Sequence, residues 1–168
     1  MTRLYLSAYG PATREAYARW LGTPSAAHAG RLLARLGDDV EETELEGDHV
    51  WVLCSDLDEL RAAEPEGIVR LLPAFDTYVV AAPRDAPAVL DPAMRDRVYR
   101  PQGWLSPVLL VDGRMEGVWR HEAKRGAVAV EIEPFGRLGK GVRAAAEAEA
   151  QRLAAFLDGE LILSWTTP

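Results

Sequence analysis

The chain has 168 residues, of which 48% are apolar, and a formal net charge of −7. This length fits one medium domain or two small ones, with enough apolar residues for a buried core. No apolar run reaches the roughly 18 residues of a membrane span. The N-terminal Met1-Thr2-Arg3 does not begin a signal peptide. We therefore expect a cytoplasmic protein that has no membrane partner.

The few cysteine and histidine residues do not indicate a metal centre. Cys54 is the only cysteine, and the three histidines lack metal-ligand spacing. Cys54 ends the apolar run 50–54 without an adjacent Lys or Arg, so we expect a small buried side chain rather than a nucleophile. Phosphate-loop, dinucleotide-binding and serine-nucleophile motifs are absent. We expect no metal and no cofactor.

Charge is distributed unevenly along the chain. Residues 1–83 contain 7 arginines and 14 acidic residues, whereas residues 84–168 contain 12 basic and 12 acidic residues. The first part therefore repels a polyanion and the second part is neutral. If the protein binds DNA, the second part is the better place to look for the contacts.

Residues 1–66 predict a winged-helix domain. Helical spacing and capping residues predict three short helices at residues 4–9, 13–22 and 23–37, followed by two strands at 40–46 and 49–54. Thr13 is a suitable N-cap for the second helix, and Thr23 before Pro24 is a strong start signal for the third. This order is typical of a winged helix with the third helix in the recognition position. A fourth short helix is expected at 56–64.

Residues 67–168 predict a β-rich domain. The expected strands lie at 68–82, interrupted at Pro73-Ala74, and at 108–111, 115–121, 127–132 and 161–165, with helices at 91–98 and 141–157. Asp112-Gly113 and Lys124-Arg125-Gly126 provide turns for a meander. The predicted class is α+β: a winged helix followed by a small antiparallel sheet or partial barrel with a covering C-terminal helix.

Two basic groups could contact DNA. The outer face of the third helix carries His28, Arg31 and Arg35, which could enter a major groove. The alternative is a solvated face, and seven acidic residues between 38 and 48 oppose phosphate binding where the wing would lie. They favour docking of another protein domain by the acidic winged helix.

The second basic group lies on the predicted hairpin. It consists of Arg114, Arg120, His121, Lys124 and Arg125. Trp119 would anchor the hairpin, and Tyr99, Arg100 and Trp104 precede it in the sequence. Such a ribbon suits contact with a DNA backbone. The alternative is an ordinary exposed hairpin of mixed charge, because Glu116 and Glu122 lie in the same segment.

The segment 71–78, LLPAFDTY, contains one acidic side chain among apolar residues. Asp76 could be a structural acceptor for turn amides or a functional carboxylate. We favour the structural role because no second carboxylate or histidine is recognisably paired with it.

Several strings resemble those of one bacterial family. They are LLPAFDTY at 71–78, PVLLVDGR at 107–114, GVWR at 117–120, YLSAYGPAT at 5–13 and ARWLG at 18–22. They resemble the winged-helix proteins related to the AlkZ/YcaQ DNA glycosylases, which excise alkylated bases and unhook interstrand crosslinks. The resemblance covers nearly all of this chain but only the C-terminal half of a full-length member, which stacks several winged helices. It implies that the segment from Arg114 to Arg125 contacts double-stranded DNA.

The catalytic motif of that family has no counterpart here. Family glycosylases use a glutamine, a hydrophobic residue and then Gln or Asp, upstream of the matched region. The only glutamines of this chain, Gln102 and Gln151, are followed by Gly103-Trp104 and Arg152-Leu153. We therefore expect a non-catalytic DNA-binding module. The alternatives are a scaffold that docks a partner or a missing N-terminal half, and a glycosylase that is active only with that half.

Overall fold

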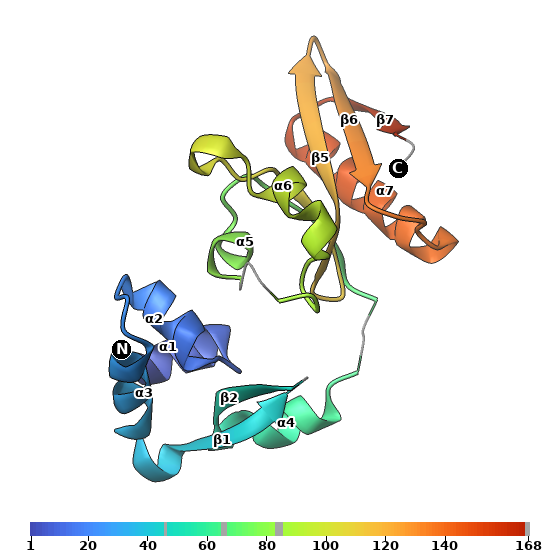
Figure 1. Ribbon diagram of the computed structural model, residues 1–168. Coiled ribbons are helices and arrows are strands. Elements are labelled where there is room, and N and C mark those ends of the chain that lie inside the picture. Colours follow the sequence, from blue (N-terminus) through green and yellow to red (C-terminus); the bar gives the residue numbers. More distant parts are fainter. Residues whose placement is uncertain (46, 65–66, 83–85, 167–168) are drawn as a thin grey trace. The chain divides into compact units, whose positions relative to one another are not determined.

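The computed structural model describes residues 1–45, 47–64, 67–82 and 86–166. The chain is α+β and forms two compact units, Met1–Glu64 and Pro65–Pro168, each shown with its elements in Figure 1. The first unit contains a two-stranded sheet and the second a five-stranded sheet. None of the described helices combines the length and the apolar character needed to cross a membrane.

The first unit consists of short helices and a hairpin. Its elements are α1 Thr2–Tyr9, α2 Arg14–Leu21, α3 Ala26–Ala34, the 3-10 turn η1 Gly37–Asp39, β1 Val40–Leu45, β2 Asp48–Leu53, η2 Cys54–Asp56 and α4 Leu57–Ala62. Strands β1 and β2 pair antiparallel. Between α1 and α2, Ala12 pairs with Trp51 of β2 through two backbone hydrogen bonds of 2.8 and 3.0 Å. The core includes Leu6, Tyr17 and Leu33.

Capping confirms one predicted helix start and corrects another. The Thr13 hydroxyl accepts a hydrogen bond from the Ala16 amide at 3.0 Å and caps α2, as predicted. In α3 the N-cap is Ser25, whose hydroxyl accepts from the His28 amide at 3.1 Å. Thr23, the predicted cap, instead accepts from the Ser25 amide at 3.3 Å, so the helix begins later than predicted.

The prediction of a buried Cys54 is wrong. The regular strand β2 ends at Leu53, which is buried, and Cys54 begins the turn η2, where its side chain is exposed. The strand pattern that buries Val50 and Val52 therefore does not extend to the thiol. The Sγ atom lies 3.5 Å from the carbonyl oxygen of Asp38.

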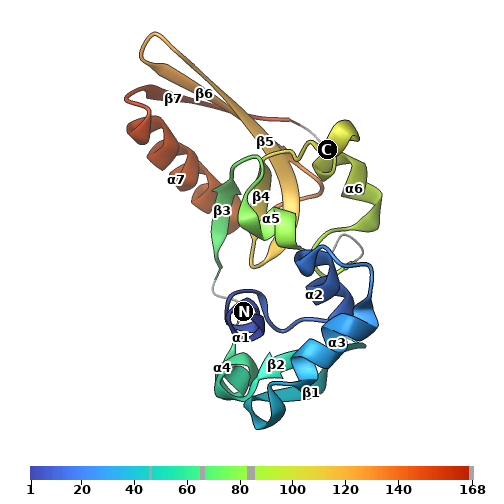
Figure 2. The same ribbon diagram turned by 90° about the vertical axis from the view of Figure 1, so that its left-hand side faces the viewer.

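The second unit has one sheet with helices on both faces. Its elements are β3 Val69–Leu72, α5 Thr77–Ala81, η3 Pro92–Met94, α6 Arg95–Val98, η4 Pro101–Gly103, β4 Val108–Val111, β5 Arg114–Lys124, β6 Ala127–Pro134, α7 Lys140–Phe156 and β7 Glu160–Trp165. The strand order is β3-β4-β5-β6-β7. Figure 2 shows β3, β4 and β5 beside one another.

The sheet is mixed and open, which corrects the prediction of an antiparallel sheet or partial barrel. The first four strands pair antiparallel, but β7 runs parallel to β6. Helix α7 connects these two strands, and such a helical crossover brings the chain back to the same end of the sheet. Within the described residues, β3 and β7 are the sheet edges and do not pair with each other.

Residues 77–81 form the helix α5, although they were predicted as part of a strand. The Asp76 carboxylate accepts a hydrogen bond from the Tyr78 amide at 2.8 Å and caps the helix. This is the structural role favoured from the sequence. A cap and a turn at the preceding Pro73 therefore prevail over the β-branched side chains that suggested a strand.

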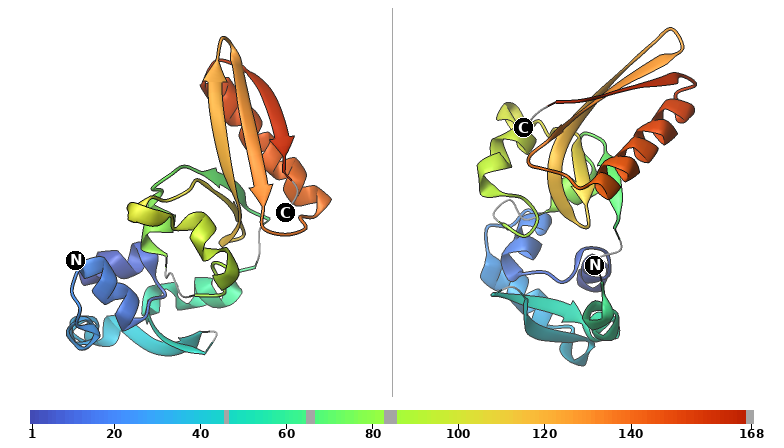
Figure 3. Two further views of the ribbon diagram at one scale, coloured as in Figure 1. Left: turned by 45° about the horizontal axis from the view of Figure 1, so that its top comes forward. Right: turned by 90° about the vertical axis from the view of Figure 1, so that its right-hand side faces the viewer.

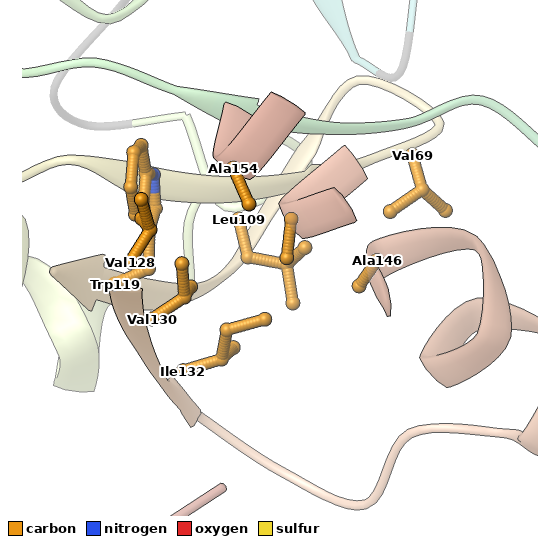
Figure 4. Close-up of a cluster of buried hydrophobic side chains, with 9 residues drawn as sticks. Val69, Leu109, Trp119, Val128, Val130, Ile132, Ala146 and Ala154 are labelled. Carbon is orange, nitrogen blue, oxygen red and sulfur yellow. The ribbon is translucent and has the colours of Figure 1, made fainter. Parts of the chain in front are cut away.

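Each face of the sheet buries its own core. Helix α7 covers one face with Ala146, Ala150 and Ala154, which pack with Trp119 and the apolar side chains of β6 (Figure 4). On the other face, residues of α5 and α6 pack with β4 and the start of β5. Figure 3 shows α6 and α7 on opposite sides of β5. The small alanine side chains allow α7 to lie close to the sheet.

Candidate nucleic-acid interface

The predicted β5–β6 hairpin extends past the end of β4, while β7 continues beside β6 as far as Ala127. Strand β4 pairs with β5 only as far as Val118, whereas β6 pairs with it as far as Lys124. The far part of β5 therefore has a strand on one side only, and the hairpin tip projects from the unit (Figure 1). Trp119 anchors the base: its side chain is 7% exposed, and its Nε1 donates to the Leu72 carbonyl at 2.8 Å.

The hairpin displays its polar side chains on two faces. Successive side chains of a strand point to opposite faces, so Arg120, Glu122 and Lys124 share the face away from α7. His121 lies on the α7 face, where its ring stacks on Trp119 with 5.5 Å between ring centroids. The predicted basic residues therefore do not form a single surface.

Two of the cations on the outer face are paired with acidic neighbours. Arg120 Nη2 lies 2.7 Å from Glu131 Oε2, and Lys124 is ion-paired with Glu122. The hydrogen bond that Arg120 donates to Glu131 raises the pKa of Arg120, and the hydrogen bond that Lys124 donates to Glu122 lowers the pKa of Glu122. Arg120, Lys124 and Glu122 are all exposed. Solvent screens exposed ion pairs of this kind, so a phosphate can replace the carboxylate.

Arg114 and Arg125 have different surroundings. Arg114 Nη1 donates to the carbonyls of Pro87 and Ala88 at 3.1 and 2.7 Å, and its Nε donates to Glu116 at 3.1 Å. These contacts bind the segment before α6 to β5 and make Arg114 a structural residue. Arg125 is exposed at the tip with φ 49°, next to Gly126 with φ 79°.

A cavity of about 400 Å³ opens at the base of the hairpin, on the face away from α7. It is lined by Arg97, Arg100, Ser106, Pro107, Val118, Trp119, Arg120, Glu131 and Glu133. Arg97 Nη2 lies 2.5 Å from Glu133 Oε1. Arg97 was not predicted as a site residue, and Arg100 was noted only as a neighbour in sequence. Arg97 lies in α6 and Arg100 follows it in extended backbone, so no helical spacing in the sequence indicated their shared surface.

In the first unit, the basic side chains of α3 lie where they were predicted. His28, Arg31 and Arg35 are exposed, on the side away from the buried Ala29 and Leu33. The acidic residues of η1 and β1 are exposed too, and Arg3 Nη1 lies 2.5 Å from Asp39 Oδ2. Among the described residues, no three His, Cys, Asp or Glu side chains come together as a metal-binding group.

The model of a DNA glycosylase family, described as AlkZ-like, matches residues 1–156. The chain belongs to the AlkZ-like DNA glycosylase family. A relative from Streptomyces sahachiroi, named interstrand DNA cross-link repair glycosylase, is 40% identical over 119 residues, which are 70% of this chain and 32% of the relative. The solved structure of the Streptomyces sahachiroi DNA glycosylase AlkZ superposes with a TM-score of 0.80 at 34% identity, covering 96% of this chain and 43% of that one.

The match to this AlkZ-like chain thus covers less than half of the length of each of these relatives, 32% and 43%. The resemblance noted from the sequence is confirmed. Of the two glutamines, Gln102 is exposed in the turn η4 and Gln151 is exposed on α7.

Proposed function

We propose that this chain is a DNA-contacting module of the AlkZ-like family that does not excise a base by itself. The observation that carries the proposal is the β5–β6 hairpin, which extends past β4 and presents Arg120 near its base and Lys124 and Arg125 at its tip. Beyond Val118 the strand β5 forms an open edge with exposed cations, and such an edge suits contact with phosphates. Double-stranded DNA is the proposed partner, in agreement with the names of the relatives.

Binding by this hairpin is expected to be moderate and sensitive to salt. Residues 114–134 contain four cations, Arg114, Arg120, Lys124 and Arg125, against four glutamates. Each phosphate contact by Arg120 or Lys124 must displace a carboxylate from its partner. Only the contacts that release counterions from DNA contribute to the salt dependence. The Arg97 and Arg100 side chains in the cavity extend the cationic surface towards the hairpin base.

The first unit is proposed to be a winged helix with a secondary role. Three helices, the β1–β2 hairpin and the pairing of Ala12 with β2 support this description. His28, Arg31 and Arg35 of α3 could reach a groove. However, residues 1–64 contain 6 arginines against 12 acidic residues, so this unit weakens rather than provides the attraction to phosphate.

The absence of the glutamine motif from the sequence supports a non-catalytic module. Base excision requires a flipped base and a group that positions or activates water. The hairpin and the cavity offer arginines and glutamates that are already engaged with one another. Recognition of alkylated or crosslinked DNA would therefore be separate from its cleavage in this chain.

The test is fluorescence anisotropy of a labelled DNA duplex across a range of salt concentrations. The variant R120Q/K124Q/R125Q should lower the magnitude of the slope of log Kobs against log salt by up to about 2.7, or 0.9 per lost phosphate contact. The control R61Q/R137Q/K140Q removes the same charge elsewhere and should alter the slope by less than about one phosphate contact. An equal slope for the hairpin variant and the wild type would refute the assignment.

A protein-docking function is the second candidate, and one observation favours it. Met1, which precedes α1, and Leu4 on α1 are exposed, and the rings of Tyr9 and Trp20, 6.5 Å apart, are 38% and 42% exposed. Apolar surface of this kind suits a protein interface. Failure of the wild type to bind DNA even at low salt would support this function. A third candidate function is glycosylase activity of this chain together with an N-terminal half that carries the glutamine motif. It requires that the two polypeptides together release a base from DNA and that neither does so alone.

A further inference from the structure

Two aromatic side chains of the second unit form an exposed pair outside both cores. Phe75 is 48% exposed and Trp104 is 61% exposed, and their ring centroids lie 5.5 Å apart at an interplanar angle of 60°. Phe75 belongs to the LLPAFD segment, which the proposed function leaves unexplained. The two residues come from separate loops, so their contact is a property of the fold rather than of a local sequence.

The backbone presents this pair in an unusual way. Phe75 has φ 59°, and Gln102, two residues before Trp104, has φ 60°; both lie in the left-handed region that side chains other than glycine rarely adopt. Such conformations persist only where neighbouring contacts impose them, and they concentrate at binding sites. The Asp76 amide donates to the Pro73 carbonyl at 3.3 Å, and the Arg100 amide donates to the Trp104 carbonyl at 2.8 Å. Both loops are therefore closed by backbone hydrogen bonds.

The loop that carries Trp104 also carries a cation, Arg100, which indicates what such a pair would bind. Arg100 lies opposite Trp104 in the same loop, and Arg97, Arg100 and Arg120 line the cavity at the hairpin base. A ligand that satisfies both features has a flat ring and a negative charge. An unpaired nucleotide has both, because its base offers a π face and its backbone offers a phosphate. An aliphatic protein surface would use the rings but would make no use of the positive charge of Arg100.

We propose that Phe75 and Trp104 form a platform on which an unpaired base of DNA stacks, while Arg100 contacts the adjacent phosphate. This proposal rests on the proposed DNA-contacting function and adds a preference for DNA in which a base is already out of the stack. Lesions and crosslinks weaken pairing, so a platform of this kind would direct the module to distorted DNA. The hairpin supplies the contacts that do not depend on base pairing.

The test compares a duplex that contains a single bulged 2-aminopurine with a fully paired duplex of the same length. The wild type should bind the bulged duplex more tightly and quench the 2-aminopurine fluorescence by stacking. The variants F75A and W104A should each lower the affinity for the bulged duplex about tenfold, because a base–aromatic stack is worth that much or more. Their affinity for the paired duplex and its salt slope should not change.

Two further variants exclude simpler explanations. W104F keeps an aromatic ring and should retain most of the quenching, whereas F156A removes an exposed aromatic from α7 and should change nothing. Circular dichroism of each variant verifies that it is folded. Equal affinity of the wild type for both duplexes, or an equal loss on both in F75A and W104A, overturns the platform while the salt-dependent binding remains. Absence of binding to either duplex overturns the platform and the DNA-contacting function together.

Discussion

Trp119 should be a principal source of stability in the second unit. Its side chain is 7% exposed and packs with Val128, Val130 and Ile132 in the core under α7 (Figure 4). Replacement by alanine removes a large buried ring and should cost about 3–5 kcal/mol of unfolding free energy. Replacement by phenylalanine keeps most of the packing but removes the Nε1 donor from the Leu72 carbonyl, which should cost about 1–3 kcal/mol.

The assay is urea denaturation followed by far-ultraviolet circular dichroism, with hydrogen exchange used to assign the transition to residues 65–168. W119A and W119F should lower the midpoint of that transition in the order given, and the first unit should keep its own midpoint. F156A is the control, because the Phe156 side chain is 85% exposed and its loss should alter stability by less than about 0.5 kcal/mol. A W119F midpoint equal to that of the wild type would refute the role of the indole hydrogen bond.

Three other predictions concern titration, backbone packing and charge. Burial raises the pKa of Tyr5 to about 12, so at pH 11 this tyrosine should be about 10% ionised in the folded protein and about 90% ionised in urea. The stability that Tyr5 contributes is therefore present below about pH 10 and is lost between about pH 10 and 12. Absorbance at 295 nm measures the ionisation, and alkaline denaturation of the wild type and Y5F measures the stability. In β5, a Cβ on Gly117 would lie 2.7 Å from a backbone oxygen of β6. The variant G117A should therefore lower the free energy of unfolding by about 1–3 kcal/mol, measured by urea denaturation. The control G136A should leave it nearly unchanged, because a Cβ at Gly136 meets open space. Glu131→Gln frees Arg120 from its ion pair and should strengthen DNA binding and steepen its salt dependence in anisotropy; weaker binding would contradict the exchange of carboxylate for phosphate.

Local signals predicted the elements that local interactions determine. The turn residues at 112–113 and 124–126 correctly placed the β4–β5–β6 meander, and Thr13 correctly placed the start of α2. The prediction failed where a distant or competing interaction decided the outcome. The five residues of α5 favour a strand by their side chains, but the Asp76 cap makes them helical. The parallel pairing of β7 depends on how α7 crosses the sheet, which no turn motif in the sequence specifies.

The candidate interface was predictable in its location but not in its arrangement. The sequence places Arg120, His121 and Lys124 on one strand, whose alternation already separates His121 from the other two; only the structure shows that His121 lies on the face that α7 covers. The partners of Arg114 include backbone carbonyls 26 and 27 residues away, so its structural role could not be deduced from neighbours in sequence. The Phe75–Trp104 pair likewise joins loops that are distant in the sequence.

Electrostatics and stacking together constrain how such a module can recognise DNA. Residues 65–168 contain 13 basic and 14 acidic residues, so the second unit has no general attraction for a polyanion. Strong nonspecific binding to intact duplex, which depends on net cationic charge, is therefore not expected. A surface whose arginines are held by glutamates gains little from phosphate alone, but it gains more when a base also stacks on Phe75 and Trp104. The near-neutral charge thus favours selectivity for distorted DNA over affinity for DNA in general, because the stacking contribution is available only where a base has left the helix.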